Sequence, residues 1–259
     1  MHHSHIDRYA QGDSPIHRLD ARAKLLAVLA YTAVVISFNR YALLALAPLS
    51  VLPLAMLWLG GIPLRFAVRR VLILCPFILV LCLAMPFYDA SAHVLRLGPR
   101  TLLLSGGTLT ALNIAIKFTL TVLALTALTS TTPFASMLEG MRRLGCPRVM
   151  AMMLGFLYRY LFVLLDEAMR LRRGRDFRGA AMASARRRLA AVGGMIGSLF
   201  VRTLERSDRV ALAMAARGFR GESHGLSVLA WSHADAIWLI LVTGYLVFCR
   251  AVYPLLLLR

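Results

Sequence analysis

Acidic residues are scarce in this sequence of 259 residues, which has 12 Asp and Glu against 30 Lys and Arg; charged residues of both signs make up only 16%. Ordinary soluble domains carry about 25% charged residues and are about 45–50% apolar, whereas this chain is 59% hydrophobic. The composition therefore argues against a soluble enzyme. It also excludes an intrinsically disordered chain, because a chain this apolar does not stay solvated.

Several motifs of catalysis and metal binding are missing as well. The four cysteines form no C-x-x-C pair and have no histidine nearby, so neither a zinc site nor a disulfide framework is predicted. No G-x-x-x-x-G-K-[ST] motif is present to cradle a phosphate. Residues 1–15 contain no apolar run, so we expect no cleavable signal peptide.

Long apolar runs are abundant. A helix crosses the apolar core of a bilayer in about 20 residues, and the five candidate spans are about 23–38, 41–62, 71–88, 101–131 and 236–258. The second contains Pro48 and Pro53, which a membrane helix tolerates when neighbouring groups satisfy the freed backbone carbonyls. The fourth contains Lys117, an intramembrane cation that is functional by default, snorkels, or pairs with a backbone carbonyl.

The distribution of basic residues predicts the orientation. If the N-terminus is cytoplasmic, the cytoplasmic segments hold 24 Lys and Arg and the exterior segments hold five. Basic residues concentrate on the cytoplasmic side of membrane proteins. We therefore expect the N-terminus inside and the C-terminus outside.

The segment 132–234 is strongly basic, with 17 arginines, no lysine and seven acids, a net charge of +10. A long helix is predicted to start at Pro147 and to meet no breaker before Gly174. Its start is apolar on most sides, so we expect that part to be buried against protein or lipid. A second long helix is predicted from about residue 189 to residue 216.

Glycines in the second helix have the spacing that permits close helix contact. Gly193, Gly194 and Gly197 include a G-x-x-x-G pair, at which another helix approaches to backbone distance. We expect the two long helices to cross there. A flexible stretch is the other explanation, because glycine costs about 1 kcal/mol in a helix interior.

Each long helix is followed by arginine and glycine. The first has Phe177, Arg178 and Gly179, and the second has Ala216, Arg217 and Gly218. Glycine past a helix end adopts the left-handed cap conformation, and a cation there complements the helix dipole. The other explanation is that two guanidinium groups at the helix tips insert into acidic clefts of a soluble partner, because the guanidinium fork pairs carboxylates in a bidentate way.

The chain resembles the transmembrane T component of energy-coupling factor transporters, in particular the CbiQ type of cobalt uptake systems. No single block is specific, but the order and spacing of the blocks are, and they cover nearly the whole chain. The blocks are 6–9, 12–20, 131–133, 144–147, 158–160, 166–167 and the two arginine-glycine ends.

The resemblance implies that the two long helices are coupling helices, whose Ala-Arg-Gly signatures dock onto two cytoplasmic CbiO-like ATPase subunits. Arg217 lies in an intact signature, whereas Phe177 stands where the family usually has alanine, which leaves Arg173 with Gly174 as a competing register. ATP-driven motion of the helices would pass to a separate CbiM-like metal-capture subunit in the membrane. The resemblance implies cobalt or nickel as the substrate and no catalysis by this chain.

The prediction is an all-α polytopic membrane protein with about five transmembrane helices and two long crossed cytoplasmic coupling helices. The expected segments are 1–22 (N-terminal, cytoplasmic), 23–131 (four spans), 132–234 (coupling helices) and 235–259 (the last span), in the bacterial cytoplasmic membrane. We expect no cofactor, no bound metal in this chain and no nucleic-acid partner, since the basic residues flank apolar spans and lack interleaved aromatic platforms.

Two competing functions remain open. An intramembrane enzyme acting on an anionic lipid would use the arginines to bind phosphate, but it needs clustered acids or an interfacial histidine. A self-sufficient channel or carrier would use Lys117 as its pore residue. The histidines at positions 2, 3, 5 and 17 raise the further possibility of metal capture.

Overall fold

The structure, a computed structural model, describes residues 10, 12–39, 43–88, 92–97, 100–177, 184–219 and 231–257. The chain forms two compact units. Unit 1 comprises Met1–Leu144 and Ser227–Arg259, and unit 2 comprises Gly145–Leu226. Each unit is described by itself below.

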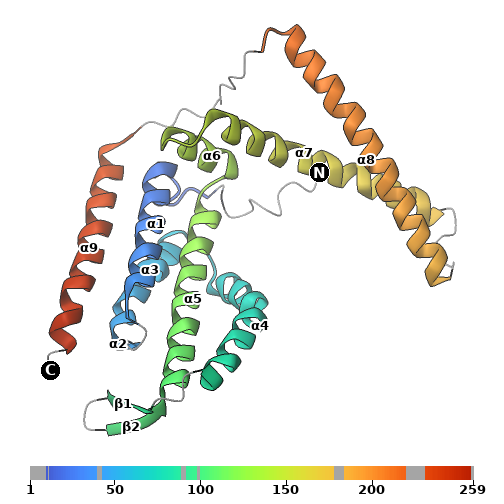
Figure 1. Cartoon of the computed structure of the whole chain (residues 1–259). Coiled ribbons are helices and arrows are strands. Elements are labelled where there is room, and N and C mark those ends of the chain that lie inside the picture. Colours follow the sequence, from blue (N-terminus) through green and yellow to red (C-terminus); the bar gives the residue numbers. More distant parts are fainter. Residues whose placement is uncertain are drawn as a thin grey trace. The chain divides into compact units, whose positions relative to one another are not determined.

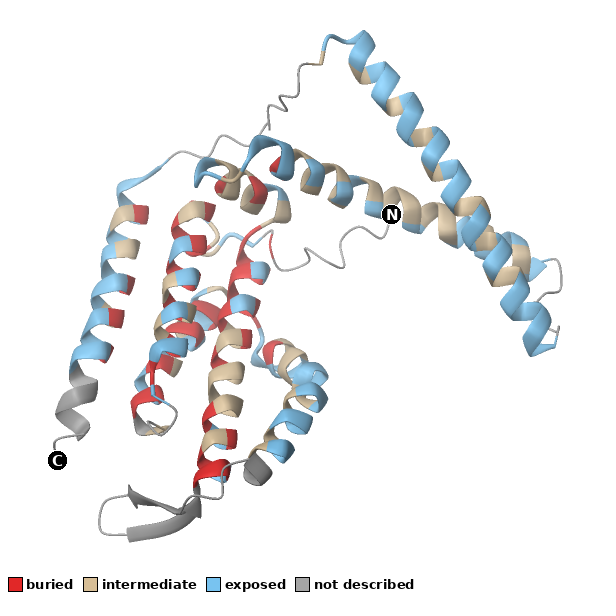
Figure 2. Cartoon of the chain, viewed as in Figure 1, coloured by how far each residue is buried: buried red, intermediate tan, exposed pale blue. Residues whose placement is uncertain are grey.

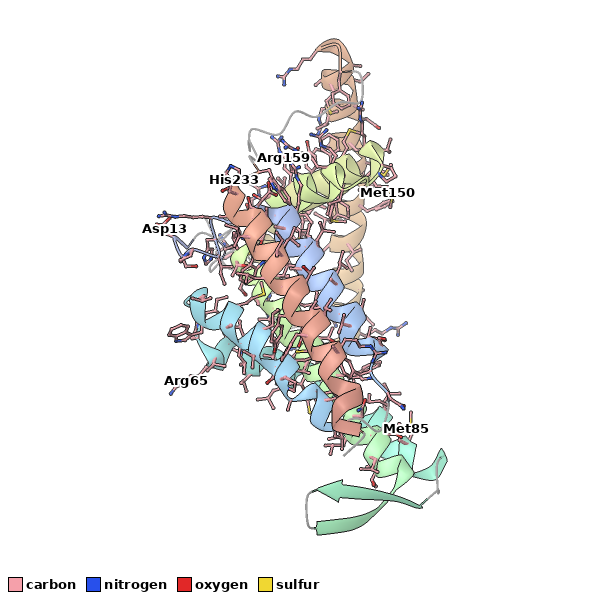
Figure 3. The ribbon with its side chains drawn as sticks, turned by 90° about the vertical axis from the view of Figure 1, so that its left-hand side faces the viewer. Asp13, Arg65, Met85, Met150, Arg159 and His233 are labelled. Atoms are coloured by element: carbon pink, nitrogen blue, oxygen red, sulfur yellow. The ribbon has the colours of Figure 1, made fainter. Side chains whose placement is uncertain are left out.

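Unit 1 is a helical bundle in which α1, α5 and α9 run side by side and α4 packs against α5 (Figure 1). Its elements, in chain order, are α1 (Ala21–Ser37), α2 (Leu43–Leu46), the 3-10 turn η2 (Pro48–Ser50), α3 (Val51–Leu59), α4 (Leu64–Tyr88), β1 (Ala92–Leu97), β2 (Arg100–Ser105), α5 (Gly106–Thr131), α6 (Phe134–Arg143) and α9 (His233–Leu257). Asp13 and His233 lie at one end of this bundle and Met85 lies toward the other (Figure 3).

The prediction of an all-α polytopic membrane protein is confirmed, with one addition. A two-stranded antiparallel hairpin, β1 and β2, connects α4 to α5, with Leu97 paired to Arg100 across the turn. The dipeptide Gly98-Pro99 between the strands is a turn signal. Strand β2 takes up residues 100–105, so the fourth predicted span begins at Gly106 and not near residue 101.

Four described helices are long and apolar enough to cross a membrane. They cover Leu64–Met85, Gly106–Thr131, Arg148–Phe177 and His233–Ala251. Three of them correspond to predicted spans, whereas Arg148–Phe177 was assigned to the cytoplasmic segment. The first predicted span is a 17-residue helix, α1, and the second is broken into short pieces.

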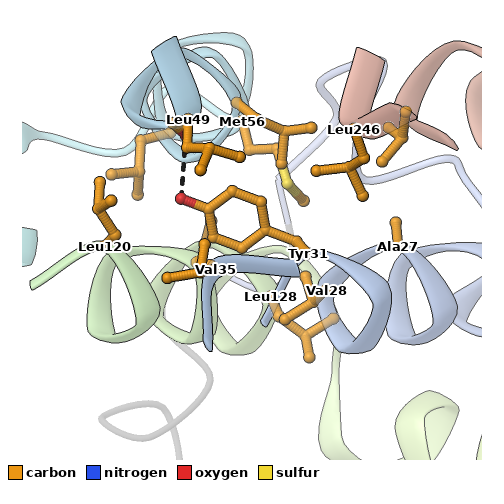
Figure 4. Close-up of a cluster of buried hydrophobic side chains, with 14 of the residues drawn as sticks. Ala27, Val28, Tyr31, Val35, Leu49, Met56, Leu120, Leu128 and Leu246 are labelled. Atoms are coloured by element: carbon orange, nitrogen blue, oxygen red, sulfur yellow. Dashed lines mark hydrogen bonds between the residues drawn. The ribbon is translucent and has the colours of Figure 1, made fainter. Parts of the chain in front are cut away.

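The break in the second span occurs at its prolines, and side chains from other helices satisfy the carbonyls there. The hydroxyl of Tyr31 on α1 donates to the Leu49 carbonyl at 2.9 Å (Figure 4). The hydroxyl of Tyr245 on α9 donates to the Pro48 carbonyl. The expectation that neighbours compensate for the prolines is therefore confirmed.

The core of unit 1 lies where α1, α3, α5 and α9 meet. Its buried side chains include Tyr31, Val35, Met56, Leu128 and Leu246, which lie close together in Figure 4. Helix α4 contributes little to this core, and most of its surface is exposed or half-buried (Figure 2). The apolar side chains of α4 therefore face lipid or another protein.

Unit 2 contains two long helices, α7 (Arg148–Phe177) and α8 (Ala185–Ala216), which cross and contact one another (Figure 1). Among their described residues only Ala151 is buried. Val149, Met150 and Met153 at the start of α7 are 56%, 56% and 63% exposed. No described residue of unit 2 supplies the cover predicted for this apolar start, so it is left for lipid or a partner.

Candidate functional site

The end of α8 is a Schellman motif built from the sequence Ala216-Arg217-Gly218-Phe219. The amide of Phe219 donates to the Met214 carbonyl at 3.0 Å and the amide of Gly218 donates to the Ala215 carbonyl at 2.9 Å. Gly218 has φ +70°, a conformation that glycine adopts without the steric cost of a Cβ. The signature residues therefore terminate the helix sharply.

Arg217 is the C-cap residue of this helix and its side chain is exposed. None of the described residues forms an ion pair with it, although Arg209 and Glu205 are 3.9 Å apart two turns earlier. A cation at a helix C-terminus is favoured by the helix dipole. The structure thus presents a guanidinium at a rigid tip, free to pair with an acidic group of another molecule.

Helix α7 ends at Phe177, which is 91% exposed. Arg178 and Gly179 lie outside the described residues. Both helices therefore end at the residue immediately before an arginine-glycine pair, because Phe177 ends α7 as Ala216 ends α8.

The competing register, Arg173 with Gly174, lies inside α7. The helix continues for three residues beyond Gly174, so this glycine does not terminate it. Arg173 is exposed on the helix surface and forms no ion pair with the described residues, while its neighbour Arg175 pairs with Asp176 at 2.9 Å. The position of Arg173 differs from that of Arg217, which lies at a helix end.

A carboxylate links α7 to α8. Glu167 accepts a hydrogen bond from Arg202 on α8 at 2.7 Å and one from Arg170 on its own helix at 2.6 Å. The Glu167 side chain is only 15% exposed. The sequence analysis used Glu167 only as part of a resemblance, and no local pattern predicted that Arg202, 35 residues away, is its partner.

An apolar groove of about 400 Å³ runs along the contact between α7 and α8. Its lining residues are Phe156, Leu157, Tyr160 and Leu164 from α7, and Thr203, Arg206, Ser207, Val210, Ala211 and Met214 from α8. The groove leads along the last turns of α8 toward the tip that carries Arg217. An exposed apolar groove of this kind is typical of a surface that binds another protein.

The structure does not place the helix crossing at the three glycines. A Cβ added at Gly193, Gly194 or Gly197 meets no described heavy atom within 4 Å. The contacts between α7 and α8 lie further along α8, at Arg202 and the groove residues. The two helices meet there because larger apolar side chains and the Glu167 ion pair are available at those positions.

The possible metal-binding and pore residues have ordinary structural partners. No group of His, Cys, Asp and Glu suited to a metal ion occurs among the described residues. The Nδ1 of His17 is 2.7 Å from the Ser14 hydroxyl, while residues 2, 3 and 5 lie outside the described range. The Lys117 ammonium donates to the Phe38 carbonyl at 2.6 Å and the Ile36 carbonyl at 3.3 Å, as expected for pairing with backbone.

Comparisons with known proteins agree with this arrangement. A family model described as CbiQ, cobalt transport protein, matches residues 12–227. The chain is similar to proteins named energy-coupling factor transporter transmembrane protein EcfT. The one from Listeria innocua is 28% identical, with 95% of this chain and 98% of that protein covered. The one from Bacillus subtilis is 26% identical with the same coverage, and the one from Limosilactobacillus fermentum is 29% identical, with 89% and 90% covered.

Proposed function

The chain belongs to the CbiQ family and is the transmembrane component of an energy-coupling factor transporter, and on that basis we propose that it couples ATP hydrolysis on separate subunits to uptake of a transition-metal cation. Unit 1 is the membrane anchor. Helices α7 and α8 of unit 2 are the coupling helices. ATP hydrolysis belongs to two cytoplasmic ATPase subunits, and substrate capture belongs to another membrane subunit.

The observation that carries this proposal is the geometry of the helix tip at Arg217. The Schellman motif holds the backbone at Gly218 in one conformation, so the exposed guanidinium of Arg217 extends from a rigid base. A pre-organised cation loses little entropy when it enters an acidic cleft. Arginine suits this role because its planar fork pairs a carboxylate in a bidentate way and keeps its charge when desolvated.

The first signature is assigned to Phe177, Arg178 and Gly179. Support comes from the equivalent ends of α7 and α8, each of which stops one residue before an arginine-glycine pair. Arg173 lies within α7 and is a surface residue in this assignment. The large exposed side chain of Phe177 takes the place of the alanine in the second signature and adds apolar contact area for a partner.

The mechanism is mechanical coupling. When the ATPase subunits close on ATP, the tips seated in their clefts move with them, and the long helices carry that displacement to the capture subunit. The Glu167–Arg202 pair joins α7 to α8, so that the two helices move together. An α-helix rises 1.5 Å per residue, so the 32 residues of α8 span roughly 48 Å.

The substrate assigned here is cobalt, with nickel as the close alternative. Its support is the description of the family model, a cobalt transport protein. Both ions are taken up as divalent cations, and neither needs a ligand in this chain if another subunit captures it.

The experiment compares three arginine variants in cells that contain the full transporter. Arg217→Ala and Arg178→Ala should insert normally but lose the co-purifying ATPase subunits, because truncating one partner of a buried charge pair costs about 2–5 kcal/mol. Uptake of radioactive Co²⁺ or Ni²⁺ should fall more than about tenfold. Arg209→Ala, an exposed arginine of the same helix, is the matched control.

Normal ATPase recovery and normal uptake in the Arg178/Arg217 double variant would contradict the docking role. Metal uptake by the purified chain in vesicles without any ATPase subunit would favour an independent carrier instead. Uptake of neither ion by the intact transporter would reject the metal assignment while leaving the docking role standing.

A further inference from the structure

Two helix ends are joined by a single buried carboxylate, that of Asp235. Its Oδ1 accepts the backbone N–H of Asp20 at 2.7 Å, and its Oδ2 accepts the backbone N–H of Ser232 at 2.8 Å. Asp20 is the N-cap of α1 and Ser232 precedes α9. Asp235 is 1% exposed, so it ties the start of α1 to the start of α9 away from water.

A third helix end is held by Lys24, in the first turn of α1. Its ammonium donates to the carbonyl of Thr131, the last residue of α5, at 2.9 Å, and to the His17 carbonyl at 3.4 Å. Lys24 is also 1% exposed. The charges suit the helix dipoles, since carboxylates lie at the N-termini of α1 and α9 and a cation lies at the C-terminus of α5.

Helix α6 packs on the same turn of α1 through a glycine. A Cβ added at Gly140 would be 3.3 Å from the Ala21 Cβ, 3.3 Å from the Leu25 Cδ1 and 3.4 Å from the Arg22 amide nitrogen. These distances leave almost no room for a side chain. The absence of a Cβ therefore allows α6 to lie directly against the first turn of α1.

The order of the chain gives these contacts a common meaning. Helix α6 ends at Arg143, and unit 2 begins at Gly145. Unit 2 ends at Leu226, and α9 begins at His233. The segment that leads into unit 2 is thus held to α1 by Gly140, and the segment that leads out is held to α1 by Asp235.

We propose that Asp20, Lys24, Gly140 and Asp235, here called the anchor cluster, position both ends of the coupling unit on the first turn of α1, so that motion of the coupling helices is transmitted to a partner and not lost at their attachments. This inference rests on the proposed function and adds positioning residues to it. A rod moves a load only if its attachments do not yield. Buried, charge-assisted hydrogen bonds are suited to that task because breaking one leaves a buried charge without its partner.

The first test uses the wild-type transporter with its ATPase and capture subunits. Hydrogen–deuterium exchange is measured at the amides of residues 20–24, 131–140 and 232–235, with and without a non-hydrolysable ATP analogue. We expect these amides to exchange slowly in both states, while amides of α7 and α8 change with nucleotide. Fast exchange in the anchor cluster, or a change there as large as in α8, would overturn the proposal.

The second test uses Asp235→Asn and Gly140→Leu in the same transporter, with Asp208→Asn, an exposed carboxylate of α8, as the matched control. Asp235→Asn should speed exchange at residues 20 and 232 by about tenfold. Both anchor variants should keep the ATPase subunits bound while fewer ions are taken up per ATP hydrolysed. Unchanged transport per ATP with the faster exchange confirmed would refute the positioning role, as would loss of uptake only in proportion to lost protein.

Failure of this inference is distinguishable from failure of the proposed function. If wild-type chain retains no ATPase subunit, the coupling function itself is wrong. If the ATPase subunits bind and the Arg217→Ala variant loses them, but the anchor variants transport normally, the function stands and the anchor cluster is only structural.

Discussion

Lys117 shows how a single intramembrane charge is accommodated. Sequence alone left three explanations: a pore residue, snorkelling, or pairing with a backbone carbonyl. The structure supports pairing, because the ammonium donates to the carbonyls of Ile36 and Phe38 at the C-terminal end of α1. A cation there satisfies carbonyls that the helix itself leaves unpaired.

We therefore expect Lys117→Met to destabilise the protein without blocking a pathway. Loss of the two hydrogen bonds should cost about 1–3 kcal/mol of unfolding free energy. Thermal unfolding in detergent would measure this loss, and Lys117→Arg should restore part of it. If Lys117→Met abolished uptake at unchanged stability and assembly, a transport role would replace the structural one.

Glu139 on α6 is a second informative residue, lying outside the membrane spans. Hydrogen bonds from Arg142, at 2.7 and 2.8 Å, and from Arg143, at 2.8 Å, lower its pKa from 4.5 to about 2, while desolvation opposes them. A carboxyl whose pKa falls on folding stabilises the folded state above its unfolded pKa. That stabilisation is lost as the pH falls from about 4.5 to about 2.

The variant Glu139→Gln should accordingly be less stable than wild type at pH 7 and equally stable near pH 2. The difference at pH 7 should reach up to about 1 kcal/mol, because the arginine side chains are 38% and 34% exposed and solvent screens the pairs. Melting temperatures at pH 7, 4 and 2.5 would test this. A difference of constant size at every pH would show that Glu139 acts by packing and not by charge.

At the scale of elements, the broken segment from α2 to α3 depends on two tyrosines from distant helices. Tyr31 is fully buried and donates to Leu49, while Tyr245 donates to Pro48. The prolines that remove helix donors are visible in sequence. Which side chains compensate for them depends on the packing of α1 and α9 against the break.

Replacing either tyrosine with phenylalanine should destabilise unit 1. Tyr31→Phe leaves a buried carbonyl unpaired and should cost about 1–3 kcal/mol, whereas Tyr245→Phe should cost less because Tyr245 is only partly buried. Unfolding midpoints of the two variants and their double variant would measure both costs. Equal losses, or a loss in Tyr245→Phe alone, would disagree with this ranking of burial.

The long elements were predictable and the short ones were not. The helix after Pro147 and the helix ending at Ala216 follow from breakers and caps in the sequence, and α7 and α8 end close to the predicted positions. The hairpin was missed because residues 101–105 are apolar and continue directly into the hydrophobic run of α5. A short apolar run of this kind reads as helix or strand until its partner strand is known.

For the whole molecule, the asymmetric distribution of arginine is the strongest predictor of orientation. Our placement has Arg217 in the cytoplasm and the hairpin outside. In a cysteine-free background, Gly98→Cys should react with a membrane-impermeant maleimide in intact right-side-out vesicles. Ser207→Cys should react only after permeabilisation. Labelling of Ser207→Cys from outside would reverse the orientation and remove the basis for ATPase docking.

The sequence by itself determined the membrane class, the long helices and the arginine-glycine signatures, because hydropathy, charge and helix caps are local properties of neighbouring residues. The tertiary structure decided which distant groups meet: Glu167 with Arg202, Lys117 with the end of α1, and Asp235 with Asp20 across 215 positions. It also moved the helix contact away from Gly193, Gly194 and Gly197. Such pairings depend on how helices pack in three dimensions, and no local pattern along the chain encodes them.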